Sequence, residues 1–93
     1  MKANEKIIKA VKELIKADED TFVNCDIGSW SGSLFIHAHN QMYPNILGKI
    51  VEIDSLLTDV LDADVLDTNI HVSFEDGPNG EARIRVTIKF EYE

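Results

Sequence analysis

The side chains best suited to nucleophilic chemistry are a single cysteine, Cys25, and three histidines, His37, His39 and His71. Cys25 belongs to an alternating segment, 21–27, in which its side chain shares the apolar face with valine and isoleucine. Burial disfavours the thiolate, which is the reactive form of cysteine, so we interpret Cys25 as a core residue. The chain also has no Cys-x-x-Cys pair, no His-Glu-x-x-His motif and no phosphate-binding loop with a lysine. We therefore predict no enzymatic activity, no catalytic residue and no cofactor.

A divalent metal is the second chemistry to consider, because His37 and His39 are two residues apart. On a strand, that spacing places both imidazoles on one side, as a transition-metal site requires. His71 is expected two strands away, roughly 10 Å by the usual distance between strands, which is too far to complete the coordination sphere. We favour solvated or hydrogen-bonding histidines and predict no metal.

Carboxylates are the most abundant functional groups. Residues 17–79 contain twelve aspartates and glutamates against a single base, Lys49, and the whole chain has a net charge of −8. Such a field favours a protein partner with a basic surface and disfavours direct contact with nucleic acid or anionic lipid. A composition selected only for solubility is the alternative. The candidate partner-binding carboxylates follow the second predicted helix and its exit: Glu52, Asp59, Asp62, Asp64 and Asp67.

Trp30 is the remaining residue of interest, because it occupies the tip of a Gly-Ser-Trp-Ser-Gly turn at residues 28–32. A lone indole in such a turn either folds back onto the sheet or serves as an anchor for a partner. We include Trp30 in the candidate partner-binding set.

The elements that must position these residues follow from periodicity. Apolar residues at helical spacing predict a helix over 4–17, with Asn4 as its cap, and a second helix over 44–62 that tolerates Gly48. Alternation predicts two hairpins, each following one helix. The first pairs residues 21–27 with 33–40; the second pairs 68–75 with 82–92 across a loop at 76–80, after an acidic connector at 63–67.

The predicted fold is therefore a single α+β domain over residues 1–93, with element order αββαββ and two helices on one face of a four-stranded, antiparallel-rich sheet. Moving the last strand to the front turns this order into βαββαβ, so the simplest packing is a circularly permuted ferredoxin-like sandwich. Its strands would lie in the order 3-4-2-1, with strands 4 and 2 central and parallel. A curved sheet in another order is the alternative.

The uncovered face of this sheet provides a second candidate site. It is expected to collect aromatic and basic side chains, an arrangement that RNA-recognition domains use to stack bases and hold phosphates. The polar outer side of an ordinary half-exposed sheet explains the same pattern. The residues of this alternative site are Phe35, His37, His39, Arg83, Arg85 and Lys89.

Small, acidic, cofactor-free α+β domains are similar, as a class, to inhibitors carried by phages and mobile elements, such as anti-CRISPR and antirestriction proteins, and to toxin-neutralising immunity proteins. This likeness is one of composition and assigns no residue a role. The leading hypothesis is an acidic inhibitor, a nucleic-acid mimic, that binds a basic nuclease or other nucleic-acid-processing protein in the host cytoplasm. The alternatives are RNA or anionic-ligand binding at the open sheet face, and a homodimeric structural component that pairs through that face.

Overall fold

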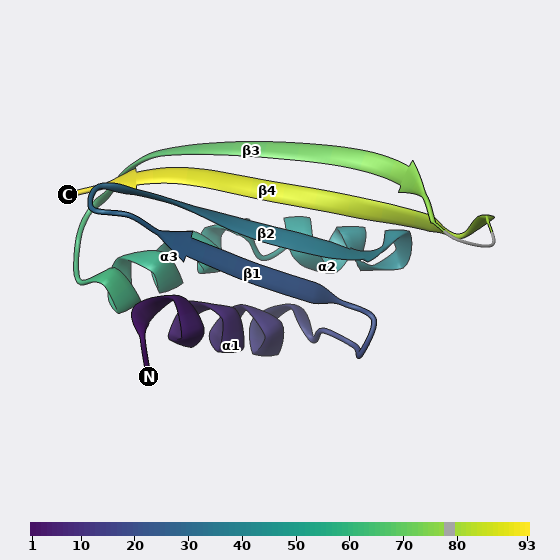
Figure 1. Cartoon of the computed structure of the whole chain (residues 1–93), viewed down its shortest axis with the longest axis horizontal. Helices are drawn as coiled ribbons and strands as arrows, with labels where there is room; N and C mark the ends of the chain where they lie inside the picture. Colours follow the sequence, from purple (N-terminus) through teal and green to yellow (C-terminus); the bar gives the residue numbers. More distant parts are fainter. Residues whose placement is uncertain (78–79) are drawn as a thin grey trace.

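The computed structural model describes residues 1–77 and 80–93. It shows an α+β fold in which three α-helices lie on one face of a four-stranded antiparallel sheet (Figure 1). Pro78 and Asn79 of the predicted loop lie outside the described residues. Within the described ranges, no helix is both long and apolar enough to cross a membrane. The elements in chain order are α1 (Ala3–Ile15), β1 (Phe22–Ile27), β2 (Ser31–His39), a short 3-10 helix η1 (Asn40–Met42), α2 (Tyr43–Leu47), α3 (Ile50–Leu61), β3 (Val65–Asp76) and β4 (Ala82–Tyr92).

The strands lie in the order β1-β2-β4-β3, which confirms the predicted order. The predicted parallel central pair is wrong, because β2 and β4 are antiparallel, with Ile36 opposite Val86. The helical crossover after β2 returns the chain so that β3 runs in the direction of β2. The hairpin then reverses β4 against both strands. The circularly permuted ferredoxin-like sandwich stays an interpretation of this strand order.

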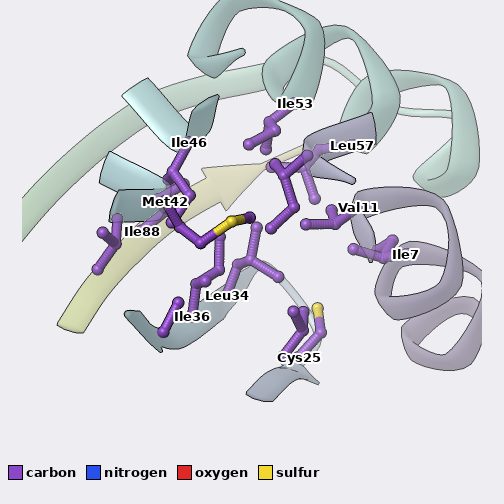
Figure 2. Close-up of a cluster of buried hydrophobic side chains, with 14 of the residues drawn as sticks. Ile7, Val11, Cys25, Leu34, Ile36, Met42, Ile46, Ile53, Leu57 and Ile88 are labelled. Atoms are coloured by element: carbon purple, nitrogen blue, oxygen red, sulfur yellow. The ribbon is translucent and has the colours of Figure 1, made fainter. Parts of the chain in front are cut away.

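The core lies between the helices and the inner face of the sheet (Figure 2). In α1, the side chains at i, i+4 and i+8 point inward, and Ile7, Val11 and Ile15 are almost fully buried. The predicted inward faces of β1, β2 and β4 are also found: Leu34 in β2 and Ile88 in β4 are at most 2% exposed. Burial of each such side chain contributes about 1.5–3 kcal/mol, so this layer holds the sheet to the helices.

The predicted second helix is broken rather than continuous. Gly48 and Lys49 separate α2 from α3, and the amide of Gly48 closes α2 by donating to the carbonyl of Pro44 at 2.9 Å. Glycine has a low helix propensity, which accounts for the break, and Ile46 and Ile53 on either side of it are both buried. The predicted cap of α1 is also wrong: the helix begins after Lys2.

Strand β3 departs most from expectation. It begins at Val65, inside the predicted connector, and contains a register shift between Val65 and Asp67 that leaves Leu66 as an extra residue. Its alternation predicts a buried apolar face, yet Ile70 is 39% exposed and Phe74 is 64% exposed. The reason is position: β3 forms the edge of the sheet farthest from α1.

Candidate functional site

One end of the molecule joins segments that are distant in sequence: the β1–β2 turn, the exit of α3, the start of β3 and the end of β4. The amide of Tyr92 donates to the carbonyl of Trp30 at 2.8 Å, and the Tyr92 hydroxyl donates to the carbonyl of Gly28. Asp64 and Glu93 exchange two backbone hydrogen bonds of 3.1 and 3.0 Å. These bonds hold the turn and the α3 exit against the end of β4.

Two large apolar side chains are exposed at this end. Trp30 is 76% exposed and Leu66 is 60% exposed. Both line a shallow hollow of about 420 Å³, together with Ser31, Tyr92 and Glu93. Trp30 therefore does not fold back onto the sheet, and the bulge in β3 places Leu66 beside the same hollow. Exposed aromatic and aliphatic side chains grouped in this way are typical of sites that bind another molecule.

Carboxylates surround this apolar pair. A second hollow, of about 390 Å³, lies at the carboxyl end of α3, and a third, of about 680 Å³, opens on the outer face of the sheet. The carboxyl end of α3 adds a partial negative charge of roughly half an elementary unit. Lys89 is the basic residue among those lining the three hollows. We call this surface the acidic end and define it by Trp30, Leu66 and seven carboxylates: Asp26, Asp59, Asp62, Asp64, Asp67, Glu91 and Glu93.

The acidic end brings together five of the six residues that the sequence suggests for partner binding: Trp30, Asp59, Asp62, Asp64 and Asp67. Glu52 lies apart from them, in a groove between α1 and α3 that Asp59 also lines. Sequence reasoning missed Asp26, Leu66, Glu91 and Glu93. Leu66 belongs to the segment expected to be a connector, and the two glutamates follow the acid-rich segment along the chain. The strand alternation alone could have placed Glu91 on the outer face.

The open sheet face carries all six residues of the alternative site, as their alternation predicts. Register places His37 between Phe22 on β1 and Arg85 on β4. The rings of Phe22 and Phe35 meet edge to face with centroids 6.1 Å apart, and Phe35 stacks on His37 at 6.3 Å. The face therefore has a short row of rings, as base stacking would need.

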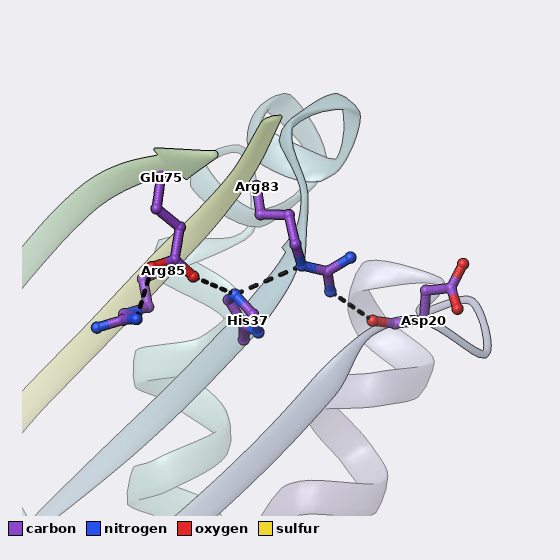
Figure 3. A network of polar contacts seen from close by, with 5 residues as sticks. All are labelled: Asp20, His37, Glu75, Arg83 and Arg85. Atoms are coloured by element: carbon purple, nitrogen blue, oxygen red, sulfur yellow. Dashed lines mark hydrogen bonds and ion pairs between the residues drawn. The ribbon is translucent and has the colours of Figure 1, made fainter. Parts of the chain in front are cut away.

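Both arginines of this face are already engaged (Figure 3). Glu75, on the edge strand, accepts from Arg85 Nη2 at 2.6 Å and lies 2.7 Å from Nε2 of His37. Arg83 donates through Nη2 to the carbonyl of Asp20 at 2.9 Å. Its Nε lies 3.4 Å from the same His37 nitrogen, which cannot accept that bond while donating to Glu75. These contacts compete with phosphate binding, and sequence reasoning did not anticipate Glu75.

The histidines do not gather around a common centre. His39 lies 3.6 Å from the carboxylate of Glu81, and His71 sits on β3 opposite Thr87. No cluster of three or more metal-ligating side chains occurs in residues 1–77 and 80–93.

Two titratable groups, Asp18 and Cys25, have shifted pKa values. Burial raises the pKa of the Cys25 thiol to about 11, and the neighbouring Asp26 carboxylate acts in the same direction. Cys25 is 1% exposed, which confirms its interpretation as a core residue. A hydrogen bond from the Thr21 hydroxyl, 2.8 Å long, lowers the pKa of Asp18 at the entry to β1.

Comparison of the chain with protein-family models, curated proteins and solved structures gave no match. The geometry of the acidic end and of the open sheet face is therefore the basis for a functional assignment.

Proposed function

We propose that the protein is a non-enzymatic binding module that holds a basic protein partner at the acidic end. The observation that supports this proposal is the placement of exposed Trp30 and Leu66 among seven carboxylates. Interfaces of this type gain most of their binding energy from a few buried aromatic anchors, while the charged rim directs the encounter. The acidic end has both kinds of side chain that such an interface needs, exposed apolar anchors and charged residues around them.

The proposed partner is a nuclease or another nucleic-acid-processing enzyme. Such proteins present a groove of lysines and arginines to phosphate, and carboxylates spaced along a rigid surface can occupy that groove in its place. The protein would then act as an inhibitor, of the kind that phages and mobile elements carry, in the cytoplasm of the host cell. Its rigidity comes from the backbone bonds that join Asp64 to Glu93 and Trp30 to Tyr92.

Binding of RNA or an anionic ligand at the open face has weaker support. Glu75 and the carbonyl of Asp20 already engage the guanidinium groups of Arg85 and Arg83. A phosphate would have to displace these partners, and four carboxylates lie on the same face: Asp26, Asp67, Glu75 and Glu91.

The experiment is affinity capture from host lysate at low salt, with identification of bound proteins and absorbance at 260 nm. The test variant carries Asp59→Lys, Asp62→Lys and Asp64→Lys. A matched control carries three reversals at exposed sites elsewhere, Glu5→Lys, Glu13→Lys and Glu19→Lys. Both variants change the net charge by the same amount. A difference in the amount of captured partner between them therefore reflects the acidic end and not the overall charge of the protein.

We expect the test variant and Trp30→Ala to lose the captured protein at least tenfold, and the control to keep most of it. The captured protein should be basic and should be inhibited when the wild-type chain is added back. Equal retention by all variants would contradict the proposal. Captured nucleic acid without protein, lost in Arg85→Ala or Phe35→Ala, would move the function to the open face.

A further inference from the structure

The long edge strand β3 has an unpaired side. It spans 12 residues, whereas the opposite edge strand, β1, spans six. In the described part of the chain, β4 is the only strand that pairs with β3. Monomeric proteins commonly protect such an edge with lysine, proline, a bulge or a short strand. Here the single register shift lies at the start of β3, and the strand contains neither lysine nor proline.

The helix-side face of β3 carries an uncovered apolar strip. Ile70 and Phe74 are 39% and 64% exposed, although their register partners on β4, Ile88 and Ile84, are buried. The ring of Phe74 touches that of Tyr43, with centroids 5.4 Å apart, so the strip is continuous with the helical layer. A strand added beside β3 would lie about 4.8 Å away, with its own side chains over this strip.

The charge of β3 indicates what kind of strand can be added. Asp67, Glu75 and Asp76 are its acidic residues, and it has no lysine or arginine. Pairing with β3 of a second copy would bring two acidic edges together, in a chain whose net charge is already −8. A segment in which apolar residues alternate with lysine or arginine would cover Ile70 and Phe74 on one face. On the other face it would meet Asp67 and Glu75, the second of which also pairs with Arg85.

We propose that β3 accepts an extended, basic-apolar segment of the protein partner as a fifth strand of the sheet. This inference rests on the proposed function, which supplies the basic partner. The two surfaces are contiguous, because Leu66 and Asp67 belong both to β3 and to the acidic end. Main-chain hydrogen bonds then supply affinity and the apolar strip supplies register, as in other cases of strand addition.

The test uses a ten-residue peptide of alternating valine and lysine, and the same peptide N-methylated at residues on both of its edges, so that neither edge can pair with β3. The two peptides share charge and side chains and differ in their ability to pair. With ¹⁵N-labelled protein, we expect the first peptide to protect amides of β3 from hydrogen exchange, and the methylated peptide to bind at least tenfold more weakly. Equal binding of both, or protection confined to other segments, would overturn the inference.

Protein variants sharpen the test. Phe74→Ser removes an exposed side chain from the strip and should weaken peptide binding several-fold. Val51→Ser removes a side chain that is 76% exposed on α3 and should leave binding unchanged. Loss of the same size in both variants, or self-association that protects β3 amides without peptide, would refute strand addition by a partner. Trp30→Ala separates the two proposals: it should abolish partner capture yet leave peptide binding at β3 intact.

Discussion

Replacement of Gly32 by alanine tests how closely β2 packs on β4 beneath the acidic end. The structure places Gly32 inside β2. At an ordinary strand position, replacing glycine by alanine stabilises a protein by about 0.5–1 kcal/mol, because alanine loses less backbone entropy on folding. The contacts around Gly32 predict the opposite sign. A Cβ at Gly32 would lie 2.5 Å from Cζ of Phe90 and 2.8 Å from the carbonyl oxygen of Asp26.

The magnitude follows from the room available to Phe90. Carbon atoms pack best about 3.5–4.0 Å apart, so the ring would have to retreat by about 1 Å. Phe90 is 2% exposed and has little space to do so, and the Asp26 oxygen belongs to a paired backbone. Overpacking of a closed core costs about 1–3 kcal/mol. For a domain of this size, we expect a fall in Tm of about 4–24 °C.

Urea unfolding followed by far-ultraviolet circular dichroism measures the effect, since the exposed Trp30 makes fluorescence a weak probe of folding. Gly28→Ala is the matched control, because its Cβ would approach no atom closer than the Ser31 carbonyl at 3.2 Å. In a Phe90→Leu background the cost of Gly32→Ala should shrink, because the aromatic Cζ is gone. A Gly32→Ala protein as stable as wild type, or more stable, would refute this steric reasoning.

Three further predictions concern the core and the shifted groups. Leu57→Ala should lower the free energy of unfolding by about 2–5 kcal/mol in urea titrations, because Leu57 is 1% exposed. The raised pKa of Cys25 stabilises the fold fully below about pH 9, and this contribution, about 3 kcal/mol, is lost as the pH rises through 11. The free energy of unfolding of Cys25→Ala should therefore depend less on pH than that of the wild type. Identical pH dependence of the two proteins would contradict the burial argument. The lowered pKa of Asp18 implies stability that is present above its ordinary pKa and is lost as the pH falls through the depressed value. Thr21→Val should move that pKa back upward in an NMR titration, and an unmoved value would exclude the hydrogen bond as its main cause.

The sequence by itself determined where most of the helices and strands lie and which side of α1, β1, β2 and β4 faces the core. Ile7, Val11 and Ile15 repeat at helical spacing, and Leu34, Ile36 and Ala38 alternate, so local periodicity was sufficient for both elements. The burial of Cys25 and the common face of His37 and His39 follow from the same alternation. These properties depend on neighbours along one segment, and neighbours are visible in a sequence.

Only the tertiary structure decided which segments and side chains lie next to one another. The alternation of β3 is the same as that of a buried strand, yet Phe74 is exposed because no helix covers that edge. The antiparallel central pair depends on how the crossover after β2 returns the chain. Trp30 lines one hollow with Leu66 and Glu93, which are more than 30 residues away along the chain, and Glu75 contacts His37 across 38 residues. Strand pairing and register set these distances. The whole sheet determines which pairing and register have the lowest free energy, so no single segment encodes them.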